Sequence, residues 1–159
     1  MRIIGGYLKG KKILEPKDKE TRPLKDLTKE SIFNILKHSS KFKVHIEDSI
    51  VLDLFSGVGS FGIECISHGV SHVTFVEKYK GVLPILKKNL SNLKSEINYE
   101  IIEADIVDEF EFKSLKFKYD IIFLDPPYKE KALKKILNTI FENKILKNKG
   151  IIIIHRHKK

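Results

Sequence analysis

The chain has 159 residues, a single cysteine and a formal net charge of +9 from 30 basic and 21 acidic residues. This length fits one domain with a full core, and one cysteine excludes a disulfide framework and is typical of the reducing cytoplasm, where we expect the protein. No apolar stretch approaches the ~20 residues of a membrane-spanning helix. The basic excess favours a polyanionic partner, but lysine dominates it, as an AT-rich genome would also produce. Arg2, Arg22 and Arg156 are therefore the more informative cations.

The first 24 residues contain glycine and lysine and precede the regular elements. We expect residues 1–24 to form a short hairpin arm ahead of a single domain that spans residues 25–159. Basic side chains outside the core elements are suited to gripping phosphates, and the alternative is a solvated, lysine-rich tail. The predicted phosphate-binding residues are Arg2, Lys9, Lys11, Lys12 and Arg22.

Strands and helices alternate through the rest of the chain. Apolar spacing predicts a first helix over 24–36, and a polar connector follows at 37–49. The alternation beyond it predicts an α/β fold with a parallel, doubly wound sheet and right-handed crossovers. The predicted strands are 50–55, 72–76, 99–103, 119–124 and 150–154, and the predicted helices are 60–68, 79–95 and 129–143.

A glycine-rich turn follows the first of these strands. Gly57, Gly59 and Gly62 match the dinucleotide spacing G-x-G-x-x-G, which by itself is a weak signal. Asp53 precedes the first glycine by four residues, where its carboxylate can reach a cationic group over the loop. A pyrophosphate would be repelled there and the ammonium group of an amino acid would be attracted. The turn therefore favours a ligand with a cationic amino-acid end.

Carboxylates also follow the next two strands. Glu77 is placed to accept hydrogen bonds from both ribose hydroxyls of a nucleoside, and Asp105 to accept one from an adenine amine. Taken singly, such acids are more often solvated loop residues. The carboxyl ends of parallel strands form one crevice, however, so the set predicts a nucleoside site.

The segment Asp125–Tyr128 follows the fourth predicted strand and reads Asp-Pro-Pro-Tyr. Two prolines make a rigid turn whose carbonyl groups point outward. The Asp125 carboxylate and the Pro126 carbonyl can accept the hydrogens of an exocyclic amine while its ring stacks on Tyr128. The segment therefore predicts a pocket for a flat, amine-bearing group.

These segments together resemble the amino-methylating S-adenosylmethionine-dependent methyltransferases. The N-terminal motifs narrow the resemblance to the RsmD family, whose members methylate the exocyclic N2 of a guanine in small-subunit (16S) ribosomal RNA. Those motifs are Arg2-Ile-Ile-Gly-Gly-Tyr-Leu-Lys-Gly-Lys, Thr21-Arg22-Pro23 and Lys29-Glu-Ser-Ile-Phe-Asn-Ile-Leu36. The resemblance covers residues 2 to about 155 and implies the Rossmann-like class I methyltransferase sheet.

The resemblance also implies roles for the site residues. Phe55 and the backbone of Gly57 to Gly59 would hold the methionine end of S-adenosylmethionine, with Asp53 on its ammonium side. Tyr128 would stack on a guanine flipped from its RNA context, while the basic arm docks ribosomal RNA, within the small subunit. We expect a monomer without a metal site, because no His/Cys cluster has ligand spacing.

Relatives in this family continue past the fifth strand into an antiparallel hairpin, whereas this chain stops at Lys159. We therefore expect a sheet without that hairpin, with residues 151–154 as an apolar edge strand. Either the chain is a truncated form, or the basic residues that follow this strand discourage association at the edge. Three alternatives stay open. They are an amino-methyltransferase acting on adenine N6 or on a protein glutamine, a nucleotide-dependent oxidoreductase, and a non-catalytic RNA-binding remnant.

Overall fold

The computed structural model describes residues 1–18, 23–94, 96–108, 110–127 and 131–156. Its centre is a five-stranded sheet with the order β3-β2-β1-β4-β5, in which every pair is parallel. This arrangement confirms the predicted α/β fold. The strands are β1 (Ile50–Leu54), β2 (His72–Glu77), β3 (Asn98–Glu103), β4 (Tyr119–Leu124) and β5 (Leu146–Ile154).

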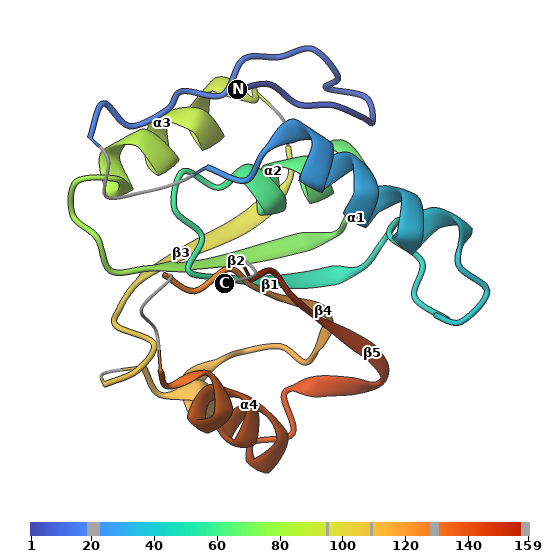
Figure 1. Cartoon of the computed structure of the whole chain (residues 1–159), viewed down its shortest axis with the longest axis vertical. Helices are drawn as coiled ribbons and strands as arrows, with labels where there is room; N and C mark the ends of the chain where they lie inside the picture. Colours follow the sequence, from blue (N-terminus) through green and yellow to red (C-terminus); the bar gives the residue numbers. More distant parts are fainter. Residues whose placement is uncertain (19–22, 95, 109, 128–130, 157–159) are drawn as a thin grey trace.

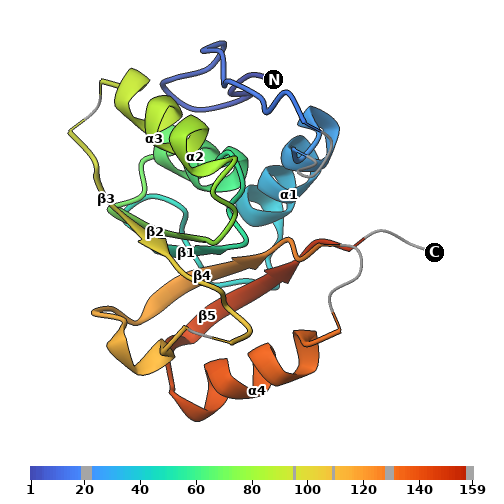
Figure 2. The same cartoon turned by 90° about the vertical axis from the view of Figure 1, so that its left-hand side faces the viewer.

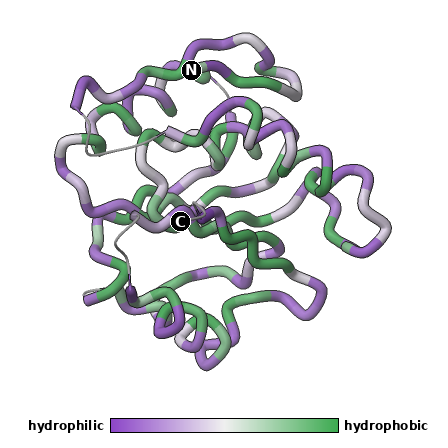
Figure 3. Tube along the Cα trace, in the orientation of Figure 1, coloured by the Kyte–Doolittle hydropathy of each residue, from purple (hydrophilic) through white to green (hydrophobic). Residues whose placement is uncertain are grey.

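Both faces of the sheet are covered, so the central strands are mostly apolar. Alternate residues of β1 enter two separate cores, with Val51 in one and Leu52 in the other. Figure 3 shows this as continuous hydrophobic stretches along the strands in the middle of the molecule, flanked by more hydrophilic connections. A strand that is buried on both sides is therefore the local reason for these runs of Val, Ile, Leu and Phe.

The helices form one layer on each face. Figures 1 and 2 show α1, α2, α3 and the N-terminal segment on one side of the sheet and α4 on the other. A short 3-10 helix, η1 (Phe112–Ser114), lies in the connection from β3 to β4. The α-helices are α1 (Asp26–His38), α2 (Ser60–Ser67), α3 (Leu83–Asn92) and α4 (Leu133–Glu142).

Three elements begin four residues away from their predicted starts: helix α3, helix α4 and strand β5. Helix α3 begins at Leu83 instead of residue 79, because Pro84 is accommodated only in the first turn of a helix. Strand β5 begins four residues before the predicted start, since a register shift separates the pair Tyr119–Leu146 from the pair Ile121–Ile151. The continuous apolar run Ile151–Ile154 marked only the regular end of that strand. No helix in the described part of the chain has the length and apolar character needed to cross a membrane.

The N-terminal arm is a hairpin, as expected, with an antiparallel bridge between Arg2 and Lys12. It is also part of the core, because Ile3, Leu8 and Ile13 are buried among residues of α1, α2 and α3. The apolar side chains of the arm are therefore part of the core, whereas the basic side chains of Arg2, Lys9 and Lys12 are exposed. The hairpin runs along α2, and the amide of Leu8 donates to the Ser67 hydroxyl oxygen at 2.9 Å.

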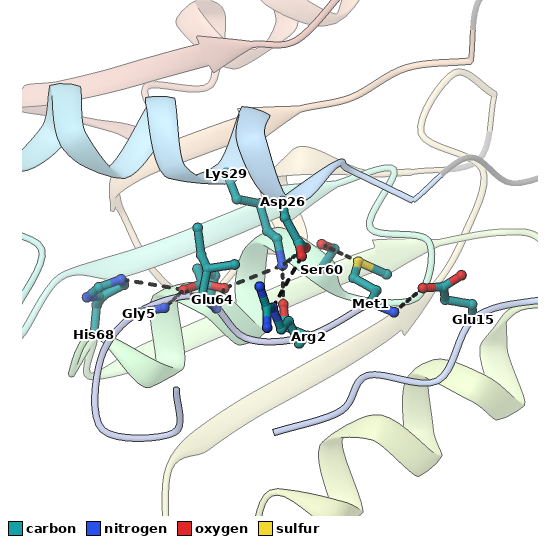
Figure 4. A network of polar contacts seen from close by, with 10 residues as sticks. Met1, Arg2, Gly5, Glu15, Asp26, Lys29, Ser60, Glu64 and His68 are labelled. Atoms are coloured by element: carbon teal, nitrogen blue, oxygen red, sulfur yellow. Dashed lines mark hydrogen bonds and ion pairs between the residues drawn. The ribbon is translucent and has the colours of Figure 1, made fainter. Parts of the chain in front are cut away.

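A buried charge network fastens this arm to the helices (Figure 4). The Lys29 ammonium is fully buried, donates to the Arg2 carbonyl oxygen at 2.6 Å and lies 3.5 Å from the Glu64 carboxylate. Glu64 is also fully buried and accepts from the backbone N–H groups of Ile4 and Gly5. Because each buried charge has partners, the network is a structural joint.

Candidate active site

Five strand ends meet at one edge of the sheet. From β1, the next two strands in the sequence, β2 and β3, are added on one side of the sheet. Strands β4 and β5 are then added on the other side of β1, so the strand order switches between β1 and β4. In an open α/β sheet, ligands bind outside the carboxyl ends of the strands at such a switch point. The glycine loop after β1 and Asp125 after β4 flank this point, at the carboxyl ends of the strands where the sequence analysis expected a crevice.

The backbone of the glycine loop is left-handed at three positions. Phe55 has a φ of 60°, Gly57 of 55° and Gly59 of 86°. A Cβ at Gly59 would lie 2.6 Å from Leu86 Cδ1, and one at Gly62 would lie 2.3 Å from Phe75 Cε1, so these two glycines permit the turn and the packing of α2. A Cβ at Gly57 would meet nothing within 4 Å. Gly57 is therefore the glycine that opens toward a ligand.

Phe55 is the only non-glycine residue of this loop with a positive φ among those described. A bulky side chain in this region of φ costs of order 1–3 kcal/mol, and such residues cluster at binding sites. Its ring is partly buried against the core on the α4 side of the sheet. The strain supports the prediction that Phe55 shapes the ligand site.

Glu77, the last residue of β2, binds the glycine loop. Its Oε2 accepts from the Gly57 amide at 2.8 Å, and its Oε1 accepts from the amides of Lys78 and Tyr79 at 2.9 and 2.8 Å. A carboxylate has about four acceptor positions, so about one remains for a ligand. Two ribose hydroxyls were predicted to donate to Glu77, but in this arrangement its carboxylate can accept from only about one of them.

Asp53 lies beneath the loop and not above it. The side chain is 1% exposed, and Oδ2 accepts from the Gly62 amide at 3.0 Å. Burial raises the pKa of Asp53 well above its ordinary value, the Gly62 bond lowers it, and the nearby carboxylates of Asp125 and Glu77 raise it further. Asp53 is thus buried beneath the loop, and direct contact with an ammonium group stays a prediction.

Asp105 follows β3 and is paired. Its Oδ2 accepts from the Lys78 ammonium at 2.8 Å and its Oδ1 accepts from the Val107 amide at 3.0 Å. The Lys78 contact, more than any other effect, holds the pKa of Asp105 below its ordinary value. Contact with an adenine amine stays a prediction, and in this arrangement Lys78 competes for the same carboxylate.

Asp125 lies at the end of β4 with Pro126 beside it, and both are partly exposed. The structure adds a partner that the sequence analysis missed, because Asp125 Oδ1 lies 2.8 Å from His155 Nδ1. His155 directly follows β5, so the rule that strand ends converge would have found it if it had been applied to the fifth strand. Tyr128 lies outside the described residues.

The basic residues of the arm do not lie together. Lys9 is in the turn at the far end of α2, where the Tyr7 amide donates to the carbonyl of Ser67, the last residue of that helix. The glycine loop adjoins the opposite end of α2. Arg2 and Lys12 form a backbone bridge with each other, lie between these two ends of α2, and are both exposed.

Two of the arm cations have partners within the chain. The Lys11 ammonium donates to the Leu93 carbonyl oxygen at 2.9 Å, so this lysine caps the end of α3. Arg2 Nε lies 3.7 Å from Asp26 Oδ2 in an exposed pair. Arg22 lies outside the described residues. Phosphate binding by the arm stays a prediction. It is least supported for Lys11, whose ammonium group is already hydrogen-bonded within the chain.

Three carboxylates lie at or beneath the crevice, and together with the glycine loop they form what we call the anionic cradle. Asp53, Glu77 and Asp125 are close enough for their charges to raise the pKa of Asp53, and the glycine loop lies over them. Such a site attracts a cation and repels a pyrophosphate. The described residues include no group of three or more His, Cys, Asp or Glu side chains that could hold a metal ion. The geometry suits a nucleoside with a cationic amino-acid end.

Comparison with known proteins shows to which family this chain is similar. The model of the family "Conserved hypothetical protein 95" matches residues 1–159. The chain is 34% identical over 159 residues to the ribosomal RNA small subunit methyltransferase D of Haemophilus influenzae, covering 99% of this chain and 79% of that protein. It is 37% identical over 157 residues to the protein of that name from Buchnera aphidicola (subsp. Acyrthosiphon pisum), covering 99% and 78%.

A solved structure from Escherichia coli, described as a candidate methyltransferase (yhhF), superposes with a TM-score of 0.82 at 29% identity and covers 100% of this chain and 82% of that one. A Thermus thermophilus structure superposes with a TM-score of 0.76 at 19% identity, covering 98% and 85%, which supports the fold alone. The sheet, the helical layers and the order of the strands are thus shared with methyltransferase structures.

Proposed function

Because the chain belongs to the RsmD family of ribosomal RNA methyltransferases, we propose that it methylates the exocyclic N2 of a guanine in 16S ribosomal RNA. The observation that carries the proposal is the pairing, at the β1/β4 switch point, of an open glycine loop with the Asp125–Pro126 turn. The loop is suited to a nucleoside cofactor and the turn to an amine.

S-adenosylmethionine fits the anionic cradle. It carries a cationic sulfonium and an ammonium group, both of which the carboxylates of Asp53, Glu77 and Asp125 would stabilise. Gly57 allows close approach of the cofactor to the backbone, since nothing lies within 4 Å of a Cβ built there. Glu77 would bind a ribose hydroxyl, and Phe55 would shape the methionine end. When bound, the cofactor supplies an electrophilic methyl group.

Guanine N2 needs help from the protein because its lone pair is delocalised into the ring. The Asp125 carboxylate and the Pro126 carbonyl would accept the two amine hydrogens and turn the lone pair toward the methyl group. Formation of the N–C bond would break the bond between the methyl carbon and the cofactor's sulfur and release S-adenosylhomocysteine. Asp125 or solvent would take the proton from the methylated, cationic nitrogen. Orientation and electrostatic stabilisation supply the rate, with no covalent intermediate on the enzyme.

RNA is the substrate that the relatives' names support, since those proteins are named ribosomal RNA methyltransferases. The net charge of +9 is consistent with a polyanionic partner. Arg2, Lys9 and Lys12 are exposed on the arm and would contact phosphates outside the crevice. The base would have to be flipped out so that its N2 can lie between Asp125 and the cofactor.

Two measurements test this proposal together. Calorimetry should show binding of S-adenosylmethionine and S-adenosylhomocysteine and none of NAD. Transfer of labelled methyl groups should be observed on 16S ribosomal RNA or on small subunits that lack the modification. Binding of NAD in place of S-adenosylmethionine would favour the oxidoreductase alternative, and cofactor binding with no transfer to either substrate would favour a non-catalytic protein.

A further inference from the structure

The register of the sheet places a histidine directly against the proposed amine-binding carboxylate. The last register pair between β4 and β5 is Leu124 with Ile154, so the next residues along, Asp125 and His155, lie side by side. The His155 amide donates to the Leu124 carbonyl oxygen at 2.9 Å, which continues the strand ladder by one step. The backbone of His155 is therefore fixed by the sheet itself.

The two side chains are in contact at the crevice edge. His155 Nδ1 and Asp125 Oδ1 are 2.8 Å apart, and the side chains are 24% and 25% exposed respectively. An ionised carboxylate only accepts hydrogen bonds, so Nδ1 must carry the hydrogen. A histidine that donates to a carboxylate fixes the orientation of that group, as in catalytic and metal sites where such partners hold the reacting residue in place.

We propose that His155 is a positioning residue for Asp125, which sets the plane of its carboxylate toward the target amine before the base arrives. This inference rests on the proposed function, in which Asp125 accepts an amine hydrogen. A free carboxylate rotates about its χ2 angle, and an amine acceptor must be oriented within about 10–20° to be effective. The Nδ1–H bond removes that rotation.

The charges around the pair favour this role. Asp53 of β1 and Glu77 of β2 are the carboxylates on the neighbouring strand ends, and Arg156 is the next cationic residue along the chain after His155. Three carboxylates in one crevice repel one another, so Asp125 on its own would tend to turn toward solvent. A donor from β5 opposes that tendency by holding Oδ1 of Asp125.

The first test needs no RNA. The nitrogen chemical shifts of His155, recorded by NMR at a pH where the ring is neutral, report which nitrogen carries the hydrogen. We expect the Nδ1–H form in the wild-type protein and loss of that preference in Asp125→Ala. The Nε2–H form in the wild type, or an unchanged tautomer in Asp125→Ala, would overturn the inference and leave the proposed function untouched.

The second test separates positioning from stability. His155→Ala should lower kcat for methyl transfer by about 10–100-fold, the usual cost of removing such a supporting contact, with KM for S-adenosylmethionine unchanged. His155→Asn should recover most of the rate, because its side-chain N–H can replace Nδ1–H. The matched control is His45→Asn, at an exposed loop position.

The outcomes are distinguishable. Wild-type kcat in His155→Ala would overturn the inference while the proposed function stands. A rate loss that Asn does not recover, or one that follows a lower melting temperature, would assign His155 a structural role and overturn it as well. A wild-type protein that transfers no methyl group to ribosomal RNA would contradict the proposed function. The tautomer measurement would then still show whether His155 donates to Asp125.

Discussion

The Oε2 atom of Glu77 accepts a hydrogen bond from the backbone amide of Gly57 at 2.8 Å, so the end of β2 holds the loop that follows β1. One carboxylate thereby shapes the loop and faces the proposed ribose position. The two roles follow from its place, since β1 and β2 are adjacent in the sheet.

We expect Glu77→Ala to weaken S-adenosylmethionine binding by about 1–3 kcal/mol, because it removes a charge-assisted ribose bond and loosens the loop. Glu103→Ala is the matched control, since Glu103 is paired in register with Glu77 at the end of β3 and its side chain is 52% exposed. Calorimetry on both variants is the measurement. Equal affinity in the Glu77 variant and the wild type would exclude Glu77 from the site.

Asp125→Ala is expected to lower turnover by orders of magnitude while S-adenosylmethionine binding is retained, because its partner is the target amine. Asp48→Asn is a suitable control, as Asp48 lies in the turn before β1 with a φ of 62°, a conformation that asparagine tolerates well. Single-turnover methyl transfer and calorimetry measure the two effects separately. Normal turnover in Asp125→Ala would disprove the proposed amine chemistry.

Much of the architecture follows from local patterns. Long apolar runs such as Tyr119–Leu124 are buried strands, and turns with glycine or proline mark their ends, so the strand ends and the glycine loop were predicted closely. Helix α3 is shorter than predicted, because Pro84 fits only in the first turn of a helix and so sets its start.

The contacts that escaped prediction join residues distant in the sequence. Asp125 meets His155 because of the β4–β5 register, and Lys29 meets Glu64 because α1 packs on α2. No local period encodes either pair. The burial of Asp53 was missed for the same reason, since a residue four positions before a glycine turn was expected to face the ligand and lies instead under α2.

The pKa of Asp53 leads to a prediction about stability. Burial raises this pKa above the ordinary value of 3.8, so the folded protein binds the proton more tightly than the unfolded chain does. The stabilising effect of that proton is complete below the unfolded pKa and is lost as the pH rises through the folded pKa. Above that range the protein carries an unfavourable buried charge.

Asp53→Asn should therefore be more stable than the wild type at pH 8, with an advantage that shrinks as the pH is lowered toward 4. The amide oxygen can still accept from the Gly62 amide, so the loop contact is kept. Binding of S-adenosylmethionine should weaken, since one negative charge beneath the loop is gone. Urea unfolding from pH 4 to pH 8 checks the first effect, and a variant less stable at pH 8 would contradict it.

The buried network predicts a large effect far from the crevice. Lys29→Met should reduce the free energy of unfolding by about 3–5 kcal/mol, because it leaves the Glu64 carboxylate buried without its ammonium partner. Burial raises the pKa of Glu64, but the effects of His68, two backbone amides and Lys29 outweigh it and hold the pKa below its ordinary value.

Faster amide hydrogen exchange at Ile4 and Gly5 should accompany the loss in Lys29→Met, since those amides donate to Glu64. Lys37→Met, at an exposed position of α1, is the control for removing a lysine charge from the same helix. If the two variants have equal unfolding free energies, the network does not fasten the arm.

The role of the arm in RNA binding is testable by changing charges, not by deletion, because Ile3, Leu8 and Ile13 belong to the core. Replacing three exposed cations by glutamine should flatten the salt dependence of RNA affinity by about 0.7–0.9 per lost phosphate contact, with cofactor affinity unchanged. The positions to change are Arg2, Lys9 and Lys12, and the control positions, on and after α4, are Lys134, Lys144 and Lys149. Identical slopes in the two triple variants would show that RNA is held elsewhere.

The central claim is that this crevice methylates a guanine N2 in 16S ribosomal RNA. The most direct measurement is mass spectrometry of nucleosides from 16S RNA after incubation with S-adenosylmethionine and either the wild type or Asp125→Ala. We expect N2-methylguanosine with the wild type and none with the variant. Methylated adenosine, or N2-methylguanosine formed equally by Asp125→Ala, would contradict the account.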